Sequence, residues 1–353
     1  MRKFVPVLSA ILLLSSCVST HRSASVHNVA FDEIVRSYAG FSGHVIVADA
    51  ASIIFNETYG EARDDVPVSL DDRWRWASVT KQLVAVAVLQ MVEQGLVGLD
   101  STIASVIPDS GVPNADRITI RHLLQHTSGL INDAVLPDEA FVNGFDARSF
   151  CRGSVNNPPG QEFDYNNCDY VILGEVLEAV DGVSWFESLD QRVFAPSGVT
   201  GVRPGLMDNG GETVAGYLTL GVPAPDVALE LYEASGGVVG TASDLLRIDR
   251  ALLSGGLLGK ELRAEMWRAD PAKGFAATGQ WMFDGQLRGC DSGVQLVERR
   301  GAISGIQSLN ILAPEQGLSV IAFVNREDFD WGAVWMQQGF AFDLLSAAVC
   351  RSN

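Results

Sequence analysis

Residues 76–95 read WASVTKQLVAVAVLQMVEQG, a polar start followed by a run that is apolar through most of its length. The run from Lys81 to Gln94 predicts a helix, and Gly95 supplies a stop signal. A helix that is apolar on most of its faces belongs inside a domain rather than on its surface. The sequence therefore places Ser78 at the beginning of a buried helix around which the domain is organised.

Ser78 and Lys81 are three residues apart, so on a helix they project from the same face and can touch. A serine hydroxyl is a poor nucleophile until a base takes its proton. A lysine in an apolar cleft can be that base, because burial disfavours its ammonium form. The alternative is a serine N-cap followed by a solvent-facing lysine. The apolar helix favours the catalytic interpretation, as does the aromatic segment 74–77, which suits the lining of a cleft.

A second group of reactive side chains follows the turn at residues 158–160, which read PPG. Tyr165 and Asn167 lie between this turn and a predicted helix over residues 168–181. A phenolic oxygen can relay a proton to a leaving group, and a carboxamide can hold a substrate amide by donating and accepting together. The alternative interpretation of this segment is an Asx-type turn and helix cap.

Segments with strand character lie at both ends of the chain, at 44–48, 52–55, 295–297, 308–312 and 318–324. Helical segments are predicted between and after them, at 118–127, 168–181, 185–194, 241–253 and 330–348. Strands at both ends with helices between them indicate an α/β fold, in which one sheet is built from the two ends and a helical subdomain is inserted. We expect a sheet subdomain over 31–77 and 235–350, a helical subdomain over 78–234, and a cleft where they meet.

The first residues predict an export signal. Arg2 and Lys3 give a positive start, and residues 4–14 are apolar but too few to span a bilayer. Small residues before Cys17 resemble a bacterial lipobox, in which the cysteine is lipidated and becomes the first mature residue. The alternative is an ordinary cleaved signal with an incidental cysteine.

We therefore expect a signal peptide over 1–16, a tether over 17–30, and a periplasmic or cell-envelope protein anchored through Cys17. Export places the other cysteines, at 151, 168, 290 and 350, in an oxidising compartment. Their pairing stays open, and free buried thiols are an equal alternative. The formal net charge of −18 argues against a nucleic-acid partner and against electrostatic adhesion to anionic lipid.

The two motifs, Ser78-x-x-Lys81 and Tyr165-x-Asn167 in the setting PPGQEFDYNNCDYVILGEVLEAVDG, resemble the serine β-lactamase-like family. That family holds class C β-lactamases, DD-carboxypeptidases, D-aminopeptidases and certain esterases. Further segments that resemble this family are spread over residues 31 to 350. They include SGHVIVAD, WASVTKQ, ITIRHLLQHTSGL and SGIQSLNILAPEQGLSVIAFVN. The resemblance implies an antiparallel sheet flanked by helices, and a serine hydrolase that requires no cofactor and no metal.

By this resemblance Ser78 forms an acyl-enzyme, Lys81 and Tyr165 handle the protons, and Asn167 positions a small-molecule or peptide substrate. The backbone N–H groups of Ser78 and Ala302 would hold the oxyanion. The substrate itself, an ester, an amide, a peptide or a β-lactam, is left open, as is the oligomeric state.

The third family motif departs from the usual pattern. The family places Lys-Thr-Gly, Lys-Ser-Gly or His-x-Gly on a strand beside the nucleophile, and the corresponding residues here are Arg299, Arg300 and Gly301. A guanidinium at Arg299 can grip a substrate carboxylate in bidentate fashion but cannot shuttle a proton. The alternative is an arginine pair on an exposed strand. This motif is also what favours a second function, a non-catalytic or slowly reacting envelope binding protein.

His122 and His126 have a spacing that can bind a metal, but neither a third ligand nor an intervening glutamate accompanies them. We expect both to cap or pack instead.

Overall fold

The computed structural model describes residues 20–132, 145–206 and 213–350. Its centre is an antiparallel six-stranded sheet with the order β10-β11-β12-β13-β1-β2. The strands are β1 (Gly43–Ala48), β2 (Ile53–Tyr59), β10 (Trp281–Gly285), β11 (Val294–Ile303), β12 (Ile306–Ala313) and β13 (Leu318–Val324). Because β1 pairs with β13, the two ends of the chain close one sheet, which confirms the predicted fold class.

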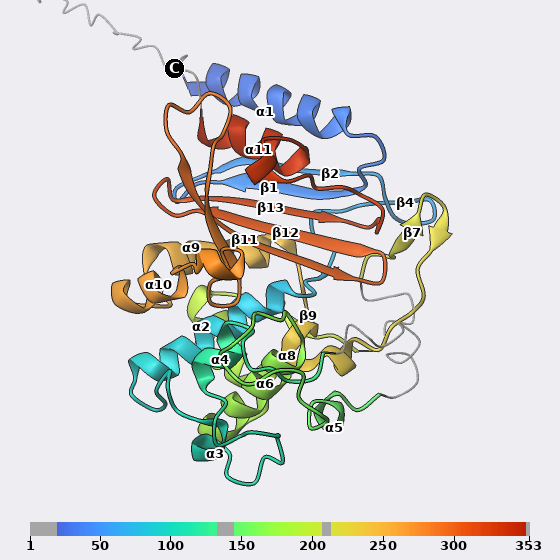
Figure 1. Ribbon diagram of the computed structural model, residues 1–353. Helices are drawn as coiled ribbons and strands as arrows, with labels where there is room; N and C mark the ends of the chain where they lie inside the picture. Colours follow the sequence, from blue (N-terminus) through green and yellow to red (C-terminus); the bar gives the residue numbers. More distant parts are fainter. Residues whose placement is uncertain (1–19, 133–144, 207–212, 351–353) are drawn as a thin grey trace, which may run out of the picture.

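Each face of the sheet is covered by helices (Figure 1). Side chains alternate along a strand, so Val45 and Val47 of β1 join one core cluster while Ile46 and Ala48 join the other. The first cluster is shared with α1 (Thr20–Ser37) and α11 (Phe340–Val349), which lie together on the outer face. The second is shared with α2 (Val79–Glu93), which is buried between the sheet and the helical subdomain.

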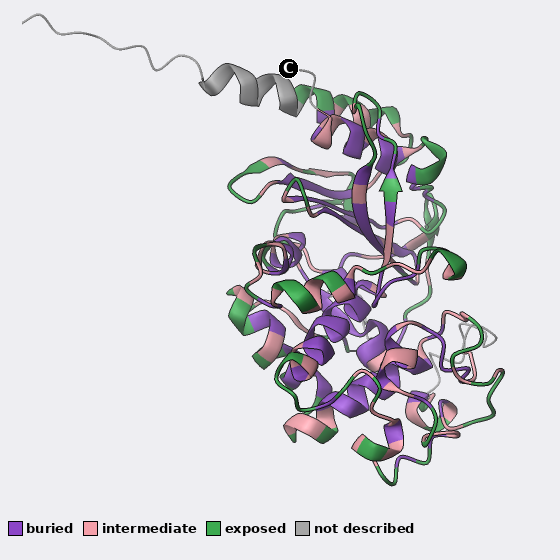
Figure 2. Cartoon of the chain, turned by 60° about the vertical axis from the view of Figure 1, so that its left-hand side comes forward, coloured by how far each residue is buried: buried purple, intermediate pink, exposed green. Residues whose placement is uncertain are grey.

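The helical subdomain packs around α2, whose buried residues continue into the neighbouring helices (Figure 2). The other α-helices are α3 (Ile103–Val106), α4 (Ile120–Leu124), α5 (Ala147–Phe150), α6 (Cys168–Asp181), α7 (Trp185–Leu189), α8 (Glu233–Gly236), α9 (Ala242–Ser254) and α10 (Lys260–Met266). The short strands are β3 (Glu61–Arg63), β4 (Val66–Pro67), β5 (Trp74–Arg75), β6 (Arg203–Pro204), β7 (Tyr217–Thr219), β8 (Val222–Pro223) and β9 (Val238–Gly240).

Two predicted segments differ in the structure. The closing helix begins at Phe340 rather than at residue 330, because Gly332 and Gly339 adopt positive φ angles of 71° and 95° that a helix does not accommodate. The sequence predicted a tether over residues 17–30, but helix α1 begins at Thr20, so residues 20–30 are helical. Phe31 and Val35 bury this helix against the sheet. The predicted signal over 1–16 and Cys17 lie outside the described residues.

The four cysteines whose pairing the sequence leaves open form two disulfides. Cys151 bonds to Cys168, with a Cα–Cα distance of 5.2 Å, and Cys290 bonds to Cys350. The first bridge ties the end of α5 to the first residue of α6, one position after Asn167. Within the described residues, no helix combines the length and apolar character that a membrane crossing requires.

A buried carboxyl group lies between the sheet and α9. Asp249 is fully buried, and Asn310 on β12 donates a hydrogen bond of 2.9 Å to its Oδ1. Burial raises the pKa of Asp249 to about 7. In the unfolded chain an aspartate titrates near 4, so between these values the folded state holds a proton that the unfolded state has lost.

We therefore expect Asp249 to lower the free energy of unfolding as pH rises from about 4 to about 7. Asp249→Asn removes this loss and keeps an acceptor for Asn310. Compared with the parent protein, the variant should gain up to about 3 kcal/mol on going from pH 5 to pH 8, measured by urea denaturation. The same difference between the two proteins at both pH values would contradict the raised pKa.

Candidate active site

A strained turn presents the candidate nucleophile. Trp76 is fixed on both sides, since its N–H donates to Val238 O at 3.0 Å and its carbonyl accepts from Ser308 Oγ at 2.9 Å. Ala77 then has φ = 50°, a left-handed conformation that costs free energy in any residue with a side chain. This turn leads directly into α2, and Ser78 is its N-cap. The sequence predicted that the aromatic segment 74–77 lines a cleft, and this prediction is wrong. Trp74 and Trp76 are fully buried and support the turn from the core.

The Ser78 hydroxyl has two catalytic partners. Tyr165 OH donates to Ser78 Oγ at 2.8 Å, and Lys81 Nζ donates to the same oxygen at 3.2 Å. Ser78 is half-buried, whereas the other residues from Trp74 to Leu89 are fully buried. The nucleophile is therefore accessible at the tip of an otherwise enclosed helix.

Lys81 is completely buried and its amine contacts three oxygen acceptors. Besides Ser78 Oγ, Nζ donates to Asn167 Oδ1 at 2.7 Å and to the backbone oxygen of Ser235 at 2.8 Å. An ammonium group has three N–H donors. The three acceptors match those donors and stabilise the charged form, which a buried site would otherwise destabilise.

Arg299 supplies a second buried cation. Its Nε donates to the backbone oxygen of Ser78 at 2.7 Å, and its Nη2 donates to Tyr165 OH. The guanidinium also lies 5.1 Å from the ring centres of both Tyr165 and Trp281. One side chain on β11 thus holds the nucleophile's backbone and the phenol that contacts the nucleophile.

The two cations change the acidity of Tyr165. Burial by itself raises the pKa of this phenol. The positive charges of Arg299 and Lys81, together with the hydrogen bond to Ser78, outweigh burial and lower the pKa to about 8. At pH 7 about a tenth of Tyr165 is therefore phenolate, the form that can accept a proton from Ser78.

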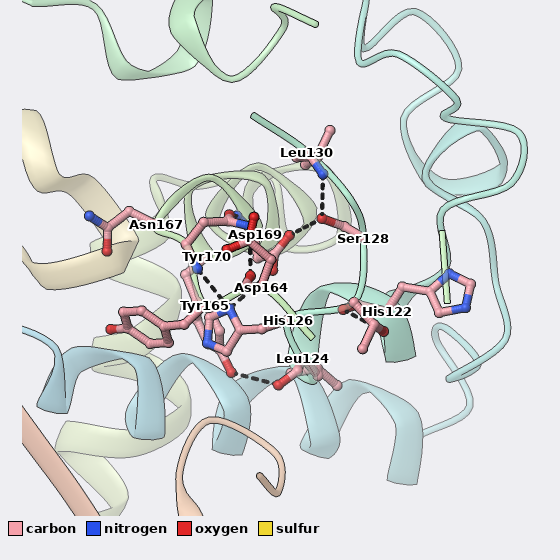
Figure 3. Close-up of polar contacts among 12 residues, drawn as sticks. His122, Leu124, His126, Ser128, Leu130, Asp164, Tyr165, Asn167, Asp169 and Tyr170 are labelled. Atoms are coloured by element: carbon pink, nitrogen blue, oxygen red, sulfur yellow. Dashed lines mark hydrogen bonds and ion pairs between the residues drawn. The ribbon is translucent and has the colours of Figure 1, made fainter. Parts of the chain in front are cut away.

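A group of buried polar side chains lies behind Tyr165 (Figure 3). The His126 ring is 4.5 Å from the Tyr165 ring, and its Nδ1 is 3.0 Å from Asp169 Oδ2. Ser128 Oγ donates to the other oxygen of Asp169 and accepts from Leu130 N at 3.0 Å. Burial raises the pKa of Asp169 well above its usual value, and burial with the nearby cations lowers the pKa of His126. Both shifts favour the uncharged form of the group.

The edge of β11 lies against the beginning of α2. β10 pairs with β11 only as far as Glu298, so residues 299–303 have no strand partner on that side. A Cβ atom at Gly301 would lie 2.8 Å from Ser78 N and 2.7 Å from Trp76 O. Only glycine permits this approach, which brings the backbone of Ala302 to the cavity beside Ser78.

A cavity of about 1030 Å³ opens on Ser78. Five aromatic side chains line it, together with two acidic and two arginine side chains and the backbone after Arg300. The lining residues are Ser78, Tyr165, Gly274, Phe275, Trp281, Phe283, Asp284, Glu298, Arg299, Arg300, Gly301, Ala302, Gln307 and Trp335. An apolar cavity with a few convergent polar groups is typical of a small-molecule site.

The comparison with known proteins agrees with this arrangement. Residues 30–338 match the protein family described as Beta-lactamase. The chain belongs to this family.

Members and structural neighbours of the beta-lactamase family include binding proteins and hydrolases. The putative penicillin-binding protein PbpX of Bacillus subtilis is 26% identical over 82% of this chain and 72% of its own length. Esterase EstB of Burkholderia gladioli is 30% identical over 48% of each chain. The solved D-amino acid amidase of Ochrobactrum anthropi has a TM-score of 0.74 at 23% identity, covering 92% of this chain and 97% of its own, and supports the fold.

Within this family fold, the structure brings together the predicted residues Ser78, Lys81, Tyr165, Asn167 and Arg299. The oxyanion role of Ser78 and Ala302 and the substrate roles of Asn167, Gly301 and Arg299 stay predictions. His122 caps α4 through Thr119, and His126 packs behind Tyr165, as expected. No cluster of metal-ligating side chains occurs among the described residues.

Sequence reasoning missed the aromatic side chains of the cavity, the acceptor Ser235 and the buried Asp169. Each comes from an element distant in sequence from the two motifs, and Trp281 lies on β10, a strand that was not predicted. The segment HTSGL, residues 126–130, was expected only to have a structural role, although Ser128 in it binds Asp169 beside the site.

We expect Gly301→Ala to separate β11 from α2, because its Cβ would collide with backbone atoms that cannot turn away. Activity should fall at least about tenfold and the free energy of unfolding by about 1–3 kcal/mol. Gly98→Ala is the control, since its Cβ would meet the Ser101 hydroxyl at 3.3 Å, and this side chain can rotate. Equal behaviour of the two variants in activity and urea denaturation would contradict the close packing.

Proposed function

We propose that the protein is a serine hydrolase that forms an acyl-enzyme on Ser78. The observation that carries the proposal is the pair of hydrogen bonds to Ser78 Oγ, 2.8 Å from Tyr165 OH and 3.2 Å from Lys81 Nζ. A hydroxyl in contact with a phenol of lowered pKa has a base within reach.

In acylation, the Tyr165 phenolate takes the proton of Ser78 while Oγ attacks the substrate carbonyl carbon. Lys81 stays an ammonium and, with Arg299, stabilises the charge that passes from the phenolate to the substrate oxygen. The N–H groups of Ser78 and Ala302 hold that oxyanion. When the tetrahedral intermediate collapses, Tyr165 returns its proton to the leaving oxygen or nitrogen, and the acyl group stays on Ser78.

In deacylation, water replaces the leaving group. The oxygen of the water attacks the acyl carbon while Tyr165 takes a proton from the water. Tyr165 then returns that proton to Ser78 Oγ. The named relatives act as esterase or amidase or carry the name penicillin-binding protein, which supports an ester, an amide or a peptide as the substrate class.

Ser78→Ala should abolish acylation. With protein lacking residues 1–17, incubated with a p-nitrophenyl ester, a fluorescent penicillin and a D-Ala-D-Ala peptide, we expect an adduct or turnover that falls at least about 1000-fold in the variant. Intact-mass spectrometry and product release measure it. Stable acylation of Ser78 without turnover would instead support the binding-protein alternative, and reaction that persists in Ser78→Ala would contradict both.

We also propose that the protein is exported and lipid-anchored through Cys17. The positive start, the short apolar run and the small residues before the cysteine support this proposal. The two disulfide bridges support an oxidising compartment.

In cells, the mature N-terminal peptide should begin at Cys17 and carry the mass of a lipid. Cys17→Ala should move the protein from the membrane fraction to the soluble fraction, because the lipid is lost and no helix of the described residues is long and apolar enough to cross a bilayer. Mass spectrometry measures the N-terminal peptide and its lipid, and cell fractionation measures where the protein is found. An unmodified N-terminus located elsewhere would contradict the anchor.

A further inference from the structure

We infer that Arg299 is a positioning residue for Tyr165, and that the cavity therefore selects neutral esters or amides with apolar or aromatic groups and no carboxylate beside the scissile bond. The inference rests on the proposed function and names the substrate class of the same site. It departs from the expectation that Arg299 grips a substrate carboxylate.

The donors of Arg299 are directed into the protein. Nε and Nη2 bind Ser78 O and Tyr165 OH, and Arg299 as a whole is only 1% exposed. Its remaining nitrogen, Nη1, is also buried, and it has no hydrogen-bond partner among the described residues. A bidentate grip needs two accessible N–H groups on one edge of the guanidinium. The N–H groups that these two bonds leave free, on Nη1 and Nη2, belong to a buried guanidinium, so Arg299 presents no such accessible edge to a substrate.

The neighbouring arginine is also engaged. Side chains alternate along β11, so Arg300 lies on the face of the strand opposite Arg299, where Glu298 is its neighbour. Arg300 Nε donates to Glu298 Oε1, and Nη2 donates to Gly332 O at 3.0 Å. Its guanidinium also lies 5.9 Å from the Trp335 ring centre. The charge of Arg300 is therefore neutralised within the wall of the cavity.

The rest of the cavity wall disfavours an anion. Asp284 and Glu298 line it, and Arg299 and Arg300 are the only basic side chains among its described lining residues. The protein's net charge of −18 adds a negative field. A substrate carboxylate that finds no free cation keeps its desolvation cost. The aromatic rings of Phe275, Trp281, Phe283 and Trp335 instead offer apolar surface.

Tyr165 is the group that Arg299 serves. Both cations act on this phenol: Lys81 Nζ lies 5.1 Å from the ring centre and lowers the pKa of Tyr165 together with Arg299, and Arg299 donates to the phenolic oxygen. Arginine stays protonated at every pH that the protein tolerates. Arg299 therefore keeps a fixed charge on the phenolic oxygen through the whole cycle. Several charged and titratable groups face Tyr165 or lie directly behind it. They are Lys81 of α2, His126 after α4, Asp164 of the loop before α6, Asp169 and Tyr170 of α6, and Arg299 of β11.

A matched pair of esters tests the selectivity. Phenyl phenylacetate and 3-carboxyphenyl phenylacetate share their acyl group and differ by one carboxylate on the leaving group. We expect kcat/KM for the neutral ester to exceed that for the charged ester at least about tenfold. In Arg299→Gln both values should fall while their ratio stays within about twofold, because the lost contact is to Tyr165.

The pH profile tests the positioning role. The acidic limb of kcat/KM should move to higher pH by about one unit in Arg299→Gln, and Arg299→Lys should reverse part of this shift. Arg268→Gln, on an exposed side chain, is the surface control. An unmoved acidic limb in Arg299→Gln would overturn the positioning role.

The outcomes separate this inference from the proposed function. Ser78-dependent turnover that prefers the charged ester, with the preference lost in Arg299→Gln or Arg300→Gln, would overturn the inference and leave the hydrolase intact. No Ser78-dependent reaction with either ester would overturn both.

Discussion

A buried ammonium group beside a hydroxyl is the constraint on which the rest of this structure depends. Lys81 is completely buried, and a charge in that position is stable only when each of its donors finds an acceptor. The acceptors come from three elements: Ser78 before α2, Asn167 before α6, and Ser235 in α8. The helical subdomain must therefore close around α2 for the lysine to be tolerated. Closing it also positions the hydroxyl, so packing and catalysis place the same demand on the chain.

The second cation extends this arrangement to the sheet. Arg299 reaches Ser78 and Tyr165 from β11, so the candidate site adds polar contacts to the apolar core that joins the sheet and the helical subdomain. Two positive charges close together need an environment that does not add a third. Burial provides one by disfavouring the charged forms of His126 and Asp169. The site is therefore balanced between two fixed cations and one phenol that can become an anion.

Much of this could be predicted from the sequence where the pattern is local. The apolar run after Lys81 and the run Leu318–Val324 have the lengths of buried elements, and the structure begins and ends them close to the predicted residues. The catalytic spacing at Ser78 and Lys81 is also local, because one helical turn brings the two together. The cavity wall was not predictable, since Trp281 and Trp335 meet only after β10 and the turn before α11 fold against β11. Such contacts depend on strand register and on loop geometry, neither of which leaves a periodic signal.

The pairing of β1 with β13 joins residues 43–48 to residues 319–324, nearly the whole length of the chain apart. Closing so long a loop is slow, and the sheet cannot be completed while its last central strand is missing. β11 and Arg299 lie on that sheet, so the reactive serine gains its second cation only after synthesis has passed β13. A truncated chain can form the apolar helix that carries Ser78, but it cannot assemble the charge pair that activates it. The topology therefore delays the contact between Arg299 and Ser78 until β13 has been synthesised and paired.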